Sequence, residues 1–207
     1  MDFVLYGTQY GGWLVDLSLI PEGSTVISAG VGEDISFDLQ LINKRSCNIV
    51  GIDPTVKSHL FIENQKNLNN FELIKMALHI EDGDIVQMYK NKRQDHVSES
   101  ILSDHQSVKD FDYYHAETIS LPTLFDKYNN ISVLKMDIEG SEYDVLENLL
   151  EVPETLKQIC VEFHHFCSNK SAEDTQKIIT RMKDLGFAEY VEKPSRVPLS
   201  EITFWRN

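Results

Sequence analysis

The sequence predicts a three-layer α/β fold built on a mostly parallel β-sheet. Short apolar runs rich in β-branched residues alternate with segments whose apolar residues recur at helical spacing. This order is typical of a parallel sheet covered by helices. Near the end of the chain, residues 187–192 and 201–206 are two strand-like segments whose connection is too short for a helical crossover. They are therefore expected to be antiparallel neighbours, with one reversed strand at the end of the sheet.

The predicted elements follow one another from residue 25 onwards. A turn at Pro21 and Gly23 precedes the first strand, and a glycine loop separates this strand from the first helix. The second strand ends at Asp53-Pro54, because proline lacks the amide donor that continued pairing needs. The predicted strands are residues 25–29, 48–53, 71–77, 84–90, 132–137 and 158–163, and the predicted helices are residues 37–45 and 57–67, with further helices after Ser120, Ser141 and Ser171.

Two segments show no clear periodicity. Residues 91–116 are polar and are expected to form a loop or insertion, which either helps to recognise a substrate or is a simple mobile connection. Residues 1–24 are expected to be an N-terminal segment. The length of the chain suits a single domain over residues 1–207, and its short start fits a domain taken from a longer polypeptide.

Composition and charge exclude several classes of protein. An apolar fraction of 42% and a charged fraction of 25% are ordinary for a soluble globular chain. The net charge of −14 opposes binding to nucleic acid or to an anionic membrane, and no apolar run is long enough for membrane insertion. Cys47, Cys160 and Cys167 make an odd count, so we expect no disulfide framework and a cytoplasmic location.

The most informative segment is V-L-K-M-D-I-E-G-S-E at residues 133–142, where an apolar strand runs into four ionisable groups and a glycine. Together with L-P-T-L-F at residues 121–125 and Val145-Leu146, it resembles the FkbM family of S-adenosylmethionine-dependent O-methyltransferases. The resemblance implies a class I methyltransferase-like Rossmann sheet and S-adenosylmethionine as cofactor. It also implies a hydroxyl acceptor on a small molecule or glycan, with a sugar preferred.

The glycine loop after the first strand is compatible with this cofactor. Gly30 and Gly32 let the backbone approach a ligand closely. The third glycine of a dinucleotide fingerprint is replaced by Ile35, and a pyrophosphate would not welcome Glu33 and Asp34. The same two acids suit the cationic sulfonium and ammonium groups of S-adenosylmethionine, so Glu33 and Asp34 are candidate cofactor contacts.

Further cofactor contacts are expected at the ends of the next two strands. Asp53 is placed to accept the two ribose hydroxyls, or to cap the helix after Pro54, and the two roles can coexist. The resemblance supports cofactor contact by Gly30, Gly32 and Asp53, and places Met76 and Ala77 near the adenine. Met76 has an alternative role in core packing.

Four acidic or basic residues follow two strands that should be neighbours. Because neighbouring strand ends converge, Asp137 and Glu139 should share a cleft with Glu162 and His164. His164 is the preferred general base because imidazole titrates in the right range, and Asp137 and Glu139 are alternative bases or groups that orient the sulfonium. His164 can instead satisfy a backbone group at the strand end. A divalent cation held by Asp137, Glu162 and His164 is permitted but not favoured.

Two other functions stay open from the sequence. An NAD-type oxidoreductase uses a similar sheet. A non-catalytic methyltransferase-like binding module would hold the cofactor without turnover, because the glycine loop departs from the family pattern at Ser28 and Asp34. Calorimetry with NAD and with S-adenosylmethionine distinguishes the first alternative from a methyltransferase.

Overall fold

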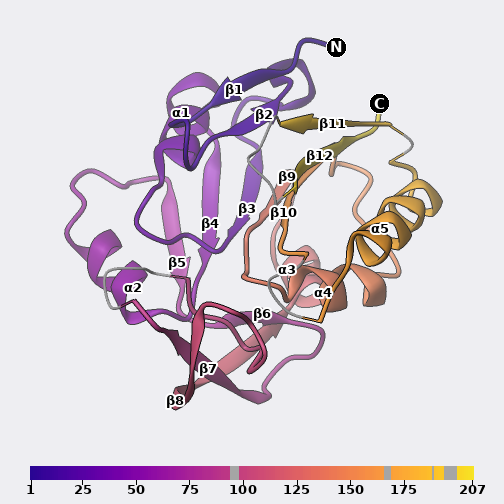
Figure 1. Ribbon diagram of the computed structural model, residues 1–207. Coiled ribbons are helices and arrows are strands. Elements are labelled where there is room, and N and C mark those ends of the chain that lie inside the picture. Colours follow the sequence, from indigo (N-terminus) through magenta and orange to yellow (C-terminus); the bar gives the residue numbers. More distant parts are fainter. Residues whose placement is uncertain (94–97, 166–168, 188, 194–199) are drawn as a thin grey trace.

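The computed structural model of the protein describes residues 1–93, 98–165, 169–187, 189–193 and 200–207. Its central feature is a seven-stranded sheet in the order β11-β12-β10-β9-β3-β4-β5 (Figure 1). The strands are β3 Thr25–Ala29, β4 Asn48–Ile52, β5 Phe71–Ile74, β9 Ile131–Met136, β10 Gln158–Phe163, β11 Glu189–Lys193 and β12 Ser200–Trp205.

All neighbouring strands of this sheet run parallel except at β12, which pairs antiparallel with both β10 and β11. The predicted mostly parallel sheet with a reversed last strand is therefore confirmed. The strand order is that of a class I methyltransferase-like Rossmann sheet, as expected. The predicted connection between β11 and β12 at residues 194–199 lies outside the described residues.

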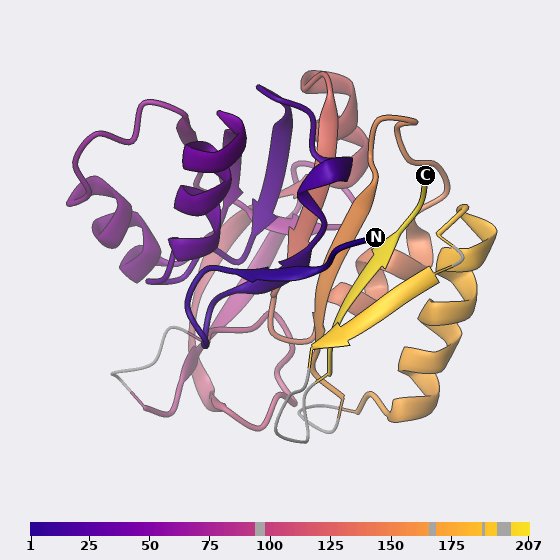
Figure 2. The same cartoon turned by 90° about the horizontal axis from the view of Figure 1, so that it is seen from above.

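Helices and a hairpin cover the two faces of the sheet and give three layers (Figures 1 and 2). The reason is the period-two alternation of apolar residues along each buried strand. Ile27, Val50, Leu134 and Ile159 belong to the larger core. That core includes residues of α3 Leu121–Lys127, α4 Glu142–Asn148 and α5 Ala172–Asp184. The residues one position earlier in the chain or one later, Val26, Ile49, Val133 and Cys160, belong to a second core on the other face.

The second core joins the sheet to α1 Ser36–Arg45 and to the N-terminal segment. This segment forms a hairpin of β1 Val4–Tyr6 and β2 Trp13–Val15, followed by a short 3₁₀ turn at Leu17–Leu19. Trp13 and Val15 are buried against α1 and the sheet. Residues 1–24 are therefore an integral part of one layer, which the sequence pattern did not predict.

A smaller three-stranded sheet is inserted between β5 and α3. It has the order β6-β8-β7, with β6 Ala77–His79, β7 Ile85–Asn91 and β8 Val108–Ser120. The predicted strand over residues 71–77 is wrong at its end, because the chain leaves the main sheet after Ile74 and β6 pairs with β8. The predicted loop over residues 91–116 is also wrong from Val108 onwards, and residues 94–97 lie outside the described part.

The predicted starts of two helices are confirmed. The Ser120 side chain accepts a hydrogen bond from the Thr123 amide at the start of α3, and Ser171 with Asp174 forms a capping box at α5. Cys47 and Cys160 are free and buried, and Cys167 lies outside the described residues. Within the described ranges, none of the helices combines the length and the apolar character that crossing a membrane requires.

Candidate active site

A cavity of about 830 Å³ opens at the carboxyl ends of the parallel strands. Its walls come from the loops after β3, β4, β9 and β10, from the small sheet and from the N-terminal hairpin. Every predicted site residue but Met76 lines it. These residues are Gly30, Gly32, Glu33, Asp34, Asp53, Ala77, Asp137, Glu139, Glu162 and His164. Strand ends that are far apart in the chain therefore meet in one place, as expected for this kind of sheet.

Met76 lies outside this lining. Its side chain packs against the larger core, whereas Ala77 and Leu78 line the cavity. The chain turns away from the main sheet after Ile74 and enters β6 at Ala77. The apolar wall that would suit an adenine ring is thus made by Ala77 and Leu78.

Gly30 fits closely against the end of β9. Its φ is +74°, and a β-carbon at this position would overlap the backbone carbonyl oxygen of Asp137. The neighbouring backbone is fully paired, since the Asp137 amide donates to the Ala29 carbonyl at 3.1 Å and the Gly30 amide donates to the Ile52 carbonyl at 2.9 Å. Both the conformation and the space therefore demand glycine.

Lys135 binds the backbone at the start of the glycine loop. Its ammonium group donates to the carbonyl oxygen of Ala29 at 3.2 Å and to the carbonyl oxygen of Gly30. The side chain is buried at the wall of the cavity. Its charge is thus directed at backbone carbonyl oxygens of the loop.

Asp53 is buried at the end of β4 and organises the floor of the cavity. Its Oδ2 accepts from the Gly32 amide at 2.9 Å, and its Oδ1 accepts from the amide and the hydroxyl of Thr55 at 2.8 and 2.7 Å. The helix α2 Val56–Glu63 is capped by Thr55, whose hydroxyl accepts from the Ser58 amide. Because a carboxylate has roughly four acceptor sites, about one site of Asp53 is left for a ligand.

Asp34 ties the N-terminal hairpin to the glycine loop. Its Oδ2 accepts from the Thr8 hydroxyl at 2.6 Å, and its Oδ1 accepts from the Ser36 amide at 2.9 Å. Burial opposes ionisation, but these hydrogen bonds hold the pKa of Asp34 below its ordinary value. Glu33, in the glycine loop, is exposed at the cavity wall. Tyr10, in the N-terminal hairpin, also lines the cavity and is 83% exposed.

His164 is held by a buried carboxylate directly after β10. Glu142 Oε1 accepts from the His164 amide at 2.8 Å and lies 2.9 Å from His164 Nδ1, and Glu142 Oε2 accepts from the Gly140 amide at 2.9 Å. Glu142 therefore fastens the turn after β9 to the end of β10. His164 Nε2 is left for the cavity.

Two acids face the free nitrogen of this imidazole. His164 Nε2 lies 3.7 Å from Asp137 Oδ1 and 3.4 Å from Glu139 Oε2. Glu139 has a φ of +55°, which is unusual for a residue with a β-carbon. Its carbonyl accepts from the Ser100 hydroxyl at 2.6 Å, so the insertion braces this turn.

The surrounding acids shift the pKa values in this part of the cavity. Burial alone would lower the pKa of His164, but Glu142, Glu139 and Asp137 together raise it well above its ordinary value. Burial and the nearby Asp137 carboxylate raise the pKa of Glu162. These shifts have one cause, an excess of carboxylates in a poorly solvated space.

Glu142 and His105 are among the residues of this site that were not predicted from the sequence. Glu142 was visible only as an acid in the first turn of a helix, and the pairing with His164 depends on the adjacency of β9 and β10. His105 lies in the polar insertion, and its ring centroid is 6.0 Å from that of His164. His165, by contrast, turns towards α5, where its Nδ1 lies 3.3 Å from the Thr175 hydroxyl.

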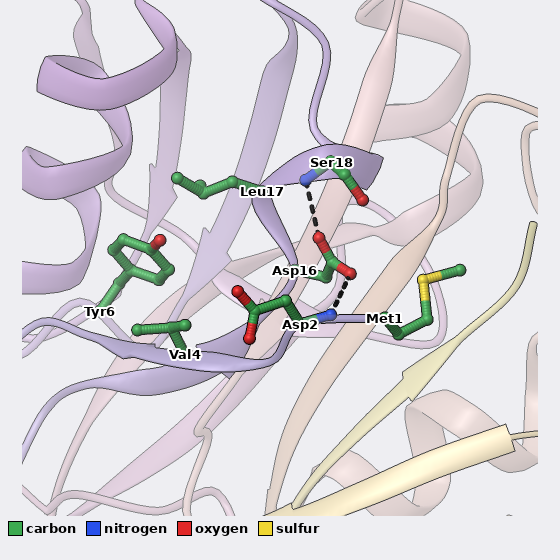
Figure 3. Close-up of a pocket in the computed structure, with 7 residues that line it drawn as sticks. All are labelled: Met1, Asp2, Val4, Tyr6, Asp16, Leu17 and Ser18. Atoms are coloured by element: carbon green, nitrogen blue, oxygen red, sulfur yellow. Dashed lines mark hydrogen bonds between the residues drawn. The ribbon is translucent and has the colours of Figure 1, made fainter.

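A second hollow lies by the N-terminal hairpin and is lined by Met1, Asp2, Val4, Tyr6, Asp16, Leu17 and Ser18 (Figure 3). The Asp16 carboxylate there accepts from the amides of Asp2 and Ser18. The Asp16 backbone is paired with the side chain of Gln158, the first residue of β10. This hollow is therefore near the amino end of that strand, opposite the edge where the larger cavity opens.

Several solved structures are similar to this chain at low identity. A precorrin-6Y C5,15-methyltransferase from Geobacter metallireducens is 13% identical, with a TM-score of 0.48 and coverage of 92% of this chain and 86% of the other. A human methyltransferase 10 domain containing protein is 9% identical, with a TM-score of 0.49 and coverage of 92% of this chain and 75% of the other. TrmK of M. capricolum in complex with S-adenosylhomocysteine is 10% identical, with a TM-score of 0.45 and coverage of 93% of this chain and 69% of the other. No curated protein sequence matches the chain.

The sheet order is that of a Rossmann-type methyltransferase fold, and the family match shows that the protein is a methyltransferase with S-adenosylmethionine as cofactor. The family model described as "Methyltransferase FkbM domain" matches residues 22–188. The chain belongs to the FkbM methyltransferase family. The resemblance predicted from residues 133–142 is thereby confirmed.

Proposed function

We propose that the protein transfers the methyl group of S-adenosylmethionine to a hydroxyl of a small-molecule or glycan acceptor, with a sugar preferred. The observation that carries this proposal is the arrangement of His164, whose Nδ1 is held by Glu142 while Nε2 faces the cavity beside Asp137 and Glu139. An imidazole oriented by a carboxylate is a common form of general base.

The cofactor is proposed to lie along the ends of β3, β4 and β9. Gly30 and Gly32 would allow close approach of its amino-acid part, and Asp53 would accept one ribose hydroxyl with its remaining acceptor site. The adenine would lie against Ala77 and Leu78. This order directs the sulfonium towards Asp137, at the acidic end of the cavity.

The reaction forms one bond and breaks one. The acceptor oxygen attacks the methyl carbon in line with the carbon–sulfur bond, whose electrons return to sulfur to give neutral S-adenosylhomocysteine. The hydroxyl proton passes to His164 Nε2. The surrounding carboxylates raise the pKa of His164, and its imidazole can accept the hydroxyl proton only in the neutral form. The positive sulfonium in the same cavity favours that neutral form.

Features of the walls support a small polyhydroxylated acceptor. Carboxylates are good acceptors for sugar hydroxyls, and Glu99, Glu139 and Glu162 all line the cavity. Three aromatic side chains are candidates for stacking on a sugar ring. Of these, Trp13 lines the cavity, Tyr114 donates to Glu99, and Tyr113 is not part of the lining. The net charge of −14 argues against a nucleic acid as acceptor.

The test is a methyl-transfer assay with S-adenosylmethionine and matched panels of glycosides, non-sugar alcohols and amines. We expect new O-methyl products from glycosides, identified by mass and by the chemical shift of the methyl carbon. Products only from amines or at carbon would contradict the proposal. Cofactor binding without turnover on any panel would favour the non-catalytic alternative.

A further inference from the structure

We propose that a divalent metal ion binds to Asp137, Glu162 and His164 at the acidic end of the cavity. One carboxylate oxygen from each acid and one ring nitrogen of the histidine all lie within 4.8 Å of one another. Ligands around one ion at 2.0–2.6 Å are separated by roughly 3–5 Å. The three side chains therefore already converge as ligands of a single ion would.

The elements that carry these ligands hold them firmly. Asp137 follows β9, while Glu162 and His164 lie at the end of β10, its parallel neighbour. Glu142 occupies Nδ1 of His164, which leaves Nε2 available. A carboxylate on the second nitrogen is the usual outer partner of a metal-binding imidazole, because it fixes the ring and raises its basicity. Glu142 itself is fully buried, and it also accepts from the backbone amides of His164 and Gly140.

The lysines near Asp137 and Glu162 form hydrogen bonds to other groups. The two lysines that line the cavity are Lys135, which donates to the carbonyls of Ala29 and Gly30, and Lys193, which donates to Glu201 and Gly12. Among the described residues, neither forms an ion pair with Asp137 or Glu162. The cationic neighbour of the two acids is His164, whose Nε2 lies 3.7 Å from Asp137 Oδ1. Two close carboxylates repel each other, and a divalent ion would compensate both.

An independent observation comes from the segment between β7 and β8. His105 is 5% exposed, lines the same cavity, and its Nε2 has no hydrogen-bond partner among the described residues. This nitrogen lies 3.7 Å from Glu139 Oε2, beside His164. A buried polar atom without a partner is costly, so it points to a ligand that this structure does not contain. Water or an acceptor hydroxyl on the ion would supply that partner.

The donor set indicates the class of ion. Two carboxylates favour Mg²⁺ or Mn²⁺, and an imidazole favours the transition metals, so the mixed set fits Mn²⁺ best. Three protein ligands leave open positions for an acceptor oxygen. With the ion bound, His164 Nε2 would be a ligand and could not also accept a proton. The ion would lower the pKa of the acceptor hydroxyl, and Glu139, which is not a ligand, would take the place of His164 as the proton acceptor. This role rests on the proposed function, whereas the metal site itself does not.

The test is a titration of the full chain with Mn²⁺, followed by the electron paramagnetic resonance signal of the free ion, without cofactor or acceptor. We expect one site in the wild-type protein. Glu162→Gln should weaken it by at least about tenfold, since even the loss of an outer partner costs roughly 10- to 100-fold in affinity. Glu33→Gln, which removes a carboxylate from the same cavity but outside the cluster, should leave the affinity unchanged.

The proposal is overturned if the wild type binds no Mn²⁺ at millimolar concentration, or if Glu162→Gln and Glu33→Gln bind it equally well. Thermal unfolding without metal shows whether each variant folds. If Glu162→Gln does not, His164→Gln provides the same comparison. Hydroxyl methylation without metal binding overturns the metal site alone, and metal binding without methylation of any hydroxyl overturns the proposed function alone.

Discussion

Gly30 lies so close to Asp137 that a β-carbon on the glycine would overlap the aspartate's carbonyl oxygen. The two residues follow the neighbouring strands β3 and β9, and both line the cavity. Substitution at residue 30 must therefore push apart the ends of these two strands.

Gly30→Ala should lower both stability and affinity for S-adenosylhomocysteine. Gly23→Ala is a matched control, because Gly23 has a similar φ of +70° but nothing within 4 Å of the place that a β-carbon would take. The control should lose only about 1–2 kcal/mol of unfolding free energy, the cost of a left-handed backbone. Chemical denaturation and calorimetry would measure both changes. Equal losses in the two variants would show that the overlap with Asp137 does not matter.

Asp53→Asn should weaken binding of S-adenosylmethionine by roughly 10-fold or more, because hydrogen bonds to charged groups contribute about 1.5–3 kcal/mol. The carboxylate also accepts from the Gly32 amide, so the substitution loosens the glycine loop as well. Isothermal titration calorimetry gives the affinity directly. An unchanged affinity would remove Asp53 from the proposed ribose role.

His164→Ala should reduce turnover by roughly 10²- to 10⁴-fold, the usual contribution of a general base, with near-normal cofactor affinity. Glu142→Gln should give a smaller loss, mainly in kcat, because Glu142 acts as a positioning residue through the His164 ring. Steady-state kinetics with an acceptor that the protein methylates measures turnover, and titration with the cofactor measures its affinity. Full activity of His164→Ala would exclude it as the base.

Asp38 should make the protein less stable as the pH rises. Burial raises the pKa of this carboxyl to about 6, and the Lys135 ammonium offsets the burial only in part. The folded state thus holds the proton more tightly than the unfolded state, whose pKa is about 3.9. Between about pH 4 and pH 6 the unfolding free energy should fall by about 3 kcal/mol on this account.

Asp38→Asn removes that titration and should raise stability at pH 8 relative to the wild type. Denaturation curves at several pH values measure the effect, and Asp126→Asn at an exposed position serves as the control. If the unfolding free energies of the wild type and of Asp38→Asn change with pH in the same way, the carboxyl of Asp38 is not the cause of the pH dependence.

Much of the sheet was predictable because its strands are locally encoded. Residues 25–29 and 131–136 are buried throughout, so each strand forms a nearly continuous apolar run that ends at a glycine or an acid. Convergence of Asp53, Asp137 and His164 then follows from parallel strand order alone. Their individual roles stay predictions.

The remaining features depend on contacts that no local pattern records. Over residues 111–117 of β8, exposed and half-buried residues alternate, and the register of the strand is set by pairs such as Ile85 with Glu117. The partnership of Glu142 with His164 spans 22 residues and exists only because β9 lies beside β10. Both needed the three-dimensional structure.

The most direct test of the account is a crystal structure of the protein with S-adenosylhomocysteine. We predict that the ribose lies against Asp53 and that the sulfur faces Asp137 and His164 in the cavity at the strand ends. Cofactor bound in the hollow beside Asp16, or turned so that its sulfur faces away from His164, would contradict the proposed site.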